Sequence, residues 1–215
     1  MDTDELLTTT RSARKALDLD APIDLDEVRD CLRIGLQAAN GSNQQSWQWL
    51  IVTDRRLRDA IANLYREAYF AKVGGQPIAG LLPSGTPERR LMSSTEWLVE
   101  NLARVPALVI PCYEPAMPRS DGDESFYLAT LYGSIFPAVW NFQLALRTRG
   151  YGTCVTTLHL HHKAAVGELL GIPESYVQGC LLPVARLRDG TVFTAAPRRP
   201  LDDVVAVNAF QRGNR

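Results

Sequence analysis

Residues 126–149 read FYLATLYGSIFPAVWNFQLALRTR, and GYGT follows at positions 150–153. Apolar residues recur on every side of the first stretch, which predicts a mostly buried helix at the centre of the fold. Pro137 should kink this helix or mark its true start. Gly150 should end it, and a short strand should follow. A helix that is apolar all round must be covered by other elements on more than one side.

Further helices and strands alternate around this central helix. The apolar periodicity predicts helices at about 24–40, 54–68, 87–104 and 163–170, and strands at 47–53, 107–113 and 178–187. Helices separated by strands indicate a three-layer α+β or α/β fold around one sheet.

The composition favours a single domain over residues 1–215. The 23 Lys+Arg nearly balance the 24 Asp+Glu, for a net charge of −1, which argues against a nucleic-acid partner. The acidic N-terminus does not resemble a signal peptide, and no apolar run is long enough for a membrane span. The four cysteines are widely separated, which is typical of reduced thiols. We therefore expect a cytoplasmic protein without a membrane partner.

Several familiar catalytic motifs are missing. The sequence contains no GxGxxG, GxxxxGK[ST] or GxSxG motif. All three histidines lie within residues 159–162, where no nearby cysteine or acidic pair completes a ligand set. We predict no metal site and interpret these side chains as capping or surface histidines.

A basic segment near the N-terminus has the chemistry to hold a phosphate. Residues 8–15 read TTTRSARK and are expected to place Arg11, Ser12 and Arg14 within two helical turns. Arginine gives an anion two parallel charge-assisted hydrogen bonds, and serine adds a neutral donor. The alternative explanation is a solvated basic face of a helix.

A polar segment, GSNQQSW at 41–47, follows one predicted helix and precedes a strand. The amides of Asn43 and Gln45 can pair with the C=O and N–H edges of a heteroaromatic ring such as a flavin. A plain polar turn is the alternative.

Two later segments are also ambiguous. Gly152 and Thr153 follow the central helix, where glycine either ends a helix or lets the backbone approach a flat ligand. Arg198 and Arg199 add cations after the last strand, either for a ligand or as part of an exposed turn.

Taken in this order, these segments resemble the FMN-dependent nitroreductase family. Four motifs carry the resemblance: residues 11–14 are similar to RSxR, residues 42–47 to SxNxQPW with serine for proline, residues 150–154 to GLGT/S, and residues 198–205 to RRPLEEVV.

The resemblance implies a three-layer α+β fold with a central mixed, mostly antiparallel sheet flanked by helices. It also implies an intertwined homodimer with FMN at the interface and residues 201–215 wrapped over the partner. The apolar residues of this tail agree with that arrangement, because they would be a liability on a monomer.

The resemblance assigns the site residues to two groups. The first would bind the FMN phosphate and the flavin N1/O2 edge: Arg11, Ser12, Arg14, Arg198 and Arg199. The second would line the isoalloxazine ring, with backbone N–H groups of its last two members directed toward N5: Ser42, Asn43, Gln45, Gly152 and Thr153.

A protein of this kind would pass electrons from NADH or NADPH through flavin N5 to a nitroaromatic, quinone or similar acceptor. One open pocket would serve both ligands in turn, which gives ping-pong kinetics, and no catalytic side-chain acid or base is required. The glycine- and proline-rich residues 74–86 are expected to form a mobile lid, with Tyr69 and Phe70 as stacking groups. An idle surface loop is the alternative.

Two other functions stay open. A storage or redox-sensing protein would bind FMN in the same fold without efficient turnover, with a lid lying over the flavin. Reductive dehalogenation and flavin fragmentation are related reactions, but the sequence shows no added signature for a zwitterionic substrate or for oxygen activation.

Overall fold

The computed structural model describes residues 1–115 and 124–210. Six helices and five strands are present in this part of the chain. The helices are α1 (Thr3–Thr9), α2 (Leu25–Gly35), α3 (Arg55–Val73), α4 (Pro87–Asn101), α5 (Glu124–Thr148) and α6 (Lys163–Leu170). The strands are β1 (Trp47–Val52), β2 (Ala107–Tyr113), β3 (Tyr151–Thr153), β4 (Val177–Gln178) and β5 (Leu182–Arg186).

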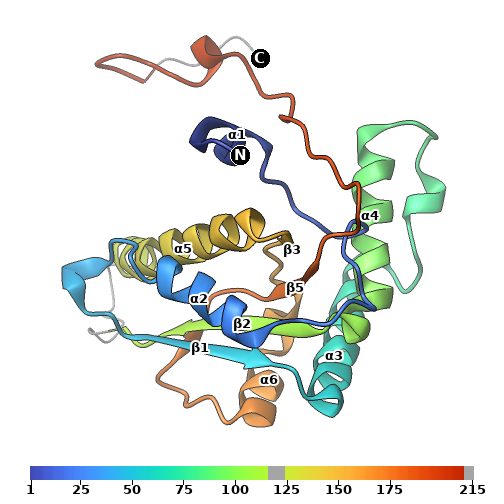
Figure 1. Ribbon diagram of the computed structural model, residues 1–215, viewed down its shortest axis with the longest axis horizontal. Helices are drawn as coiled ribbons and strands as arrows, with labels where there is room; N and C mark the ends of the chain where they lie inside the picture. The colour runs from blue at the N-terminus through green and yellow to red at the C-terminus, as the bar shows by residue number, and fades with distance from the viewer. Residues whose placement is uncertain (116–123, 211–215) are drawn as a thin grey trace.

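One sheet forms the middle layer of the molecule (Figure 1). Its strand order is β1-β2-β5-β3, β4 also pairs with β2, and all these pairings are antiparallel. The three-layer α+β prediction is therefore confirmed.

Strand β2 organises the two cores, because all seven of its residues are buried. Successive side chains point to opposite faces of a strand. Leu108 and Ile110 accordingly join one apolar cluster, which contains residues of α3, α4 and α6. Val109 and Tyr113 join the other cluster, which contains residues of α2 and α5. Both faces of the sheet are thus covered by helices.

The predicted strand at 178–187 is interrupted, so that expectation was wrong. Cys112 pairs with Gln178 and Val109 pairs with Leu182, so three residues, 179–181, stand opposite two on β2. This is the pattern of a β-bulge. The N–H of Gly179 donates to the carbonyl of Pro111 at 2.8 Å. A Cβ at Gly179 would lie 2.8 Å from Cγ2 of Ile135, so only glycine fits there.

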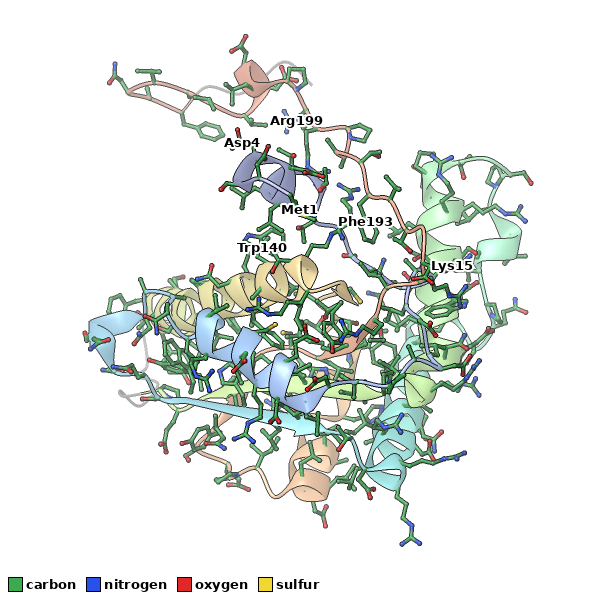
Figure 2. All side chains as sticks on the ribbon, in the orientation of Figure 1. Met1, Asp4, Lys15, Trp140, Phe193 and Arg199 are labelled. Atoms are coloured by element: carbon green, nitrogen blue, oxygen red, sulfur yellow. The ribbon has the colours of Figure 1, made fainter. Side chains whose placement is uncertain are left out.

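Helix α5 confirms the central helix but differs in detail from the expectation. It continues through Pro137, so this proline does not mark its start. Phe142 and Leu146 are buried as expected, whereas Trp140 is 42% exposed. Figure 2 shows Trp140 on the side of α5 that faces α1.

Helix α2 is shorter than predicted, since it ends at Gly35 instead of near Asn40. The N–H groups of Gln37 and Ala38 bond to carbonyls only three residues back, which tightens and ends the helix. Gly35 packs directly on α5, because its Cβ would lie 3.0 Å from Cβ of Phe142.

A polar cluster joins α2 to strands β3 and β5. Oε2 of Glu27 accepts hydrogen bonds from the Tyr151 hydroxyl at 2.9 Å and from Arg186 at 2.7 Å. The Arg186 guanidinium also lies 4.0 Å from the centre of the Tyr151 ring. Tyr151 is only 1% exposed, so its hydroxyl depends on these partners.

Replacing Tyr151 with phenylalanine is expected to lower the free energy of unfolding by about 1 to 2 kcal/mol, because a buried hydrogen bond is lost. Urea denaturation measures the change. Tyr132→Phe is the matched control, since Tyr132 is an exposed tyrosine on α5. Equal stability of the two variants would contradict a stabilising role for this cluster.

Candidate functional site

The basic N-terminal segment is extended rather than helical, which corrects the expectation of two helical turns. Helix α1 ends at Thr9, and Thr10 has an extended ψ of 123°. The hydroxyls of Thr8, Thr9 and Thr10 each donate to the carbonyl four residues back. The Leu6 carbonyl already accepts from the Thr10 N–H, so these hydroxyl bonds do not pair the last carbonyls of the helix; α1 ends where the backbone of Thr10 becomes extended.

This segment is fixed along the edge of the sheet. The Ala13 N–H donates to the Thr153 carbonyl at 2.9 Å, and the Asp18 N–H donates to the Arg186 carbonyl at 2.8 Å. Leu17 forms an isolated bridge with Leu187. The structure therefore brings Arg11, Ser12 and Arg14 next to Gly152 and Thr153, two positions that lie far away in the sequence.

The cations of this segment lack carboxylate partners within the part of the chain that the structure describes. No ion pair there involves Arg11 or Arg14. Arg14 lies against the buried thiol of Cys154. Burial raises the pKa of that thiol to about 11, and Arg14 opposes this rise only in part. The positive charges are thus available to an anion.

Two buried polar atoms, one of them beside Ala13, have no hydrogen-bond partner. They are Oγ1 of Thr153, which follows Gly152 on β3, and Nε of Arg147, near the end of α5. Buried polar atoms in folded proteins are normally paired, so an unpaired one calls for an explanation. A polar ligand beside Ala13 and Thr153 provides one.

Close packing of neighbouring side chains requires a glycine at position 152. A Cβ at this position would lie 2.5 Å from Cδ2 of Leu187 and 2.8 Å from Cβ of Ala13. The close approach that the glycine permits is therefore made by apolar side chains of the N-terminal segment and of the chain after β5.

The polar loop between α2 and β1 is held in an unusual conformation. Ser42, Asn43 and Gln45 have φ values of 51°, 51° and 54°, which non-glycine residues rarely adopt. Nε2 of Gln45 donates to Oδ1 of Asn43 at 3.2 Å, and all three side chains are exposed. Local strain of this kind is concentrated at functional sites.

Gly152 and Thr153 lie beside the basic segment, but the structure does not bring the polar loop at 41–45 to that segment within one chain. In Figure 1 the loop between α2 and β1 lies at the end of the molecule opposite α4, whereas the segment after α1 runs toward α4. Within residues 1–115 and 124–210, no hydrogen bond or ion pair connects residues 41–45 with residues 11–14 or with the tail.

The chain that follows β5, called the tail from here on and described to residue 210, leaves the body on the same side as α1 (Figure 1). At its base, the Arg147 guanidinium lies 4.8 Å from the centre of the Phe193 ring; Figure 2 labels Phe193 and Arg199 along this segment. Arg198 donates to the carbonyl of Pro197 and Arg199 to that of Asp203, and both arginines are exposed. Phe210 is 90% exposed. Residues 211–215 of the predicted wrapping tail lie outside the described residues.

The predicted lid, residues 74–86, is hydrogen-bonded to helix α4. Oε1 of Glu96, on α4, accepts hydrogen bonds from the N–H groups of Ile78 and Ala79 and from the Tyr69 hydroxyl. Arg89 donates to the carbonyl of Leu82. Tyr69 is only 3% exposed, so it is not placed to stack on a ligand. Its neighbour Phe70 is half-buried and packs edge-to-face on Tyr69.

The histidine interpretation was wrong for His159. This side chain is fully buried, and neither ring nitrogen has a partner. Burial lowers the pKa of His159 to about 4, which keeps the ring neutral. Among the described residues, no group of three or more His, Cys, Asp or Glu side chains is placed to hold a metal ion. All four cysteines are buried and free, as predicted.

Comparison with known proteins identifies the family. The nitroreductase family profile matches residues 7–186. The chain belongs to the nitroreductase family. Among curated proteins, none matches the sequence. Within residues 1–115 and 124–210, no helix is both long and apolar enough to span a membrane.

Several solved structures share the fold of this nitroreductase-family chain. Iodotyrosine deiodinase bound to FMN and 3-iodo-L-tyrosine is 21% identical, with a TM-score of 0.68 and coverage of 96% of this chain and 99% of that one. Nitroreductase A of Vibrio parahaemolyticus is 19% identical, with a TM-score of 0.71 and coverage of 100% and 79%. A variant of the FMN- and NADPH-dependent nitroreductase NfnB from Sphigopyxis sp. strain HMH is 19% identical, with a TM-score of 0.66 and coverage of 98% and 100%.

Sequence reasoning missed Glu96, Arg147 and Ser134. Each is a single polar residue on a helix, with no motif around it. For Ser134 alone, helical spacing could have indicated burial, because it places this serine on the same side of α5 as the apolar residues Leu131 and Ala138.

Glu96→Ala is expected to raise amide hydrogen exchange at Ile78 and Ala79 by about tenfold or more, because bonds to a charged acceptor are lost. Burial raises the pKa of Glu96, but the hydrogen bonds from Ala79, Tyr69 and Ile78 lower it to a net value below its ordinary 4.5. The ionised Glu96 carboxylate therefore stabilises the attachment fully above pH 4.5, and this stabilisation is lost as the pH falls through the lowered pKa. Glu100→Ala, at an exposed position of α4, is the control. Unchanged exchange in Glu96→Ala would refute the attachment.

Proposed function

We propose that this nitroreductase-family protein is an FMN-dependent oxidoreductase. NADH or NADPH would be the reductant, and a nitroaromatic, quinone or similar small molecule the acceptor. The observation that carries the proposal concerns Arg11 and Arg14, which have no carboxylate partner among the described residues. Their segment is bonded through Ala13 to Thr153, whose buried hydroxyl is unpaired. The similarity to FMN-binding structures supports it.

The residues present fit FMN. A phosphate carries about −1.5 to −2 charges, which Arg11 and one of the tail arginines, Arg198 or Arg199, would offset. Ser12 would add a neutral hydrogen bond. Arg14 would stabilise negative charge on the N1/O2 edge of the ring, and the amides of the 41–45 loop would meet polar atoms of the ring.

FMN, when bound, supplies the two-electron chemistry that couples a nicotinamide to the acceptor. The chain's own residues bind and orient the ligands. One shared pocket for reductant and acceptor would give ping-pong kinetics, and the proposal requires no catalytic acid or base.

The site would be completed by a second copy of the chain. One chain separates the 41–45 loop from the 11–14 segment, so in a homodimer the loop of one protomer would meet the arginines of its partner. The exposed tail supports this proposal, because Leu201, Val207 and Phe210 are 71%, 73% and 90% exposed. Such apolar exposure is explained if the tail covers the partner.

The variant Arg11→Ala combined with Arg198→Ala is expected to purify as a nearly colourless, flavin-poor protein. Each charge-assisted bond to the phosphate contributes about 1.5 to 3 kcal/mol, so FMN affinity should fall at least 100-fold. Visible absorbance and a dissociation constant for FMN are the measurements. Arg33→Ala is the control, because Arg33 is an exposed arginine that pairs with Asp30. Full FMN occupancy in the double variant would overturn the phosphate assignment.

Anaerobic stopped-flow mixing with NADH and NADPH tests turnover against storage. An oxidoreductase should lose its flavin absorbance near 450 nm at a rate of about 1 s⁻¹ or faster, within the usual range of enzyme turnover. A second mixing with a quinone should restore the absorbance. A flavin that stays oxidised for minutes with both nucleotides would favour the storage alternative.

A further inference from the structure

The loop at residues 41–47 is clamped at both ends by one residue of α5. The N–H of Gly41 donates to Oγ of Ser134 at 3.0 Å. Nε1 of Trp47 donates to the main-chain carbonyl of the same serine at 2.8 Å. The five residues between these two attachment points include Ser42, Asn43 and Gln45, the proposed contacts with the flavin ring.

Ser134 is well fixed for this task. It is 1% exposed, and its hydroxyl donates to the Thr130 carbonyl at 2.8 Å, which directs the oxygen lone pairs toward Gly41. The site is also tightly packed, since a Cβ at Gly41 would lie 3.2 Å from Oγ of Ser134.

The clamp explains how the loop keeps its unfavourable backbone. Three non-glycine residues with φ near +50° persist only where the surroundings over-determine them. Within the loop, Oδ1 of Asn40 accepts from the Gln45 N–H at 3.0 Å, and Gln45 in turn bonds to Asn43. These bonds fix the loop internally, whereas Ser134 fixes it to the body.

We propose that Ser134 is a positioning residue, which holds the 41–45 loop in the geometry that receives the flavin ring. This inference rests on the proposed function, because it assigns the loop to the ring. It distinguishes Ser134 from the arginines, since Ser134 would act on the ring end of the ligand and the arginines on the phosphate.

The test compares two ligands that share the ring, riboflavin and FMN, on the full-length protein after its flavin has been removed. Ser134→Ala is expected to weaken both ligands by about fivefold, the effect of one neutral hydrogen bond, and to leave their affinity ratio unchanged. Arg11→Ala should instead weaken the binding of FMN alone and thereby reduce the ratio of FMN affinity to riboflavin affinity. Amide exchange of Gly41 should rise in Ser134→Ala even without a ligand.

Two further variants make the test specific. Thr148→Val is the matched control, because the Thr148 hydroxyl also bonds within α5, to the Ala145 carbonyl, but does not touch the loop. It should leave riboflavin affinity unchanged. Trp47→Phe removes the second attachment and should also weaken both ligands. It replaces Ser134→Ala in the test if Ser134→Ala does not fold.

The possible outcomes distinguish a failure of the proposed function from a failure of the positioning role of Ser134. If the wild-type protein binds neither ligand, the proposed function is wrong and the inference is overturned with it. If the wild type binds both, but Ser134→Ala and Trp47→Phe bind riboflavin as tightly as the wild type, the positioning role alone is wrong. A loss of FMN affinity without a loss of riboflavin affinity would also refute it.

Discussion

The burial of β2 on both faces is the constraint on which the rest of the structure depends. Each residue of this strand is inaccessible to water, so helices must cover the sheet above and below. Two separate apolar clusters result, one with residues of α3, α4 and α6 and the other with residues of α2 and α5. Because α5 is fixed against the sheet in this way, it provides a rigid support from which Ser134 reaches the loop before β1.

The candidate site lies where this rigid body meets segments that it holds only in part. The arginine segment is fixed by main-chain bonds at Ala13 and Asp18, but its guanidinium groups keep no carboxylate among the described residues. The tail is anchored at Phe193 and then runs exposed to Phe210. Among the described residues, the guanidinium groups of Arg11 and Arg14 would therefore not have to leave an ion pair to meet the proposed cofactor.

Periodicity predicted most of the fold from sequence. β2 and α6 have the predicted bounds, and β1, α4 and α5 lie close to theirs, whereas α3 continues to Val73, beyond the predicted end at residue 68. The errors have local causes that apolar spacing does not encode: main-chain bonds that end α2 at Gly35, the extended backbone of Thr10 that ends α1, and a bulge at Gly179. The family was predictable because it rests on short motifs, whereas the clamp at Ser134 and the attachment at Glu96 depend on pairs such as Gly41 and Ser134, which meet only after folding. His159 shows the same limit, since its burial follows from packing.

The bulge at Gly179 also constrains how the length of this segment can change. On its two sides the alternation of side chains is reversed: Val177 packs with the α2–α5 cluster, as do the even-numbered Leu182 and Val184. Removing one residue between β4 and β5 would leave two residues opposite two on β2, so the bulge would disappear while the side chains of β5 kept their facing. Removing two would leave one residue opposite two on β2, and continuous alternation would then turn every later side chain of β5 to the other face. The bulge therefore accommodates one extra residue in this connection without changing the face to which each side chain of β5 points.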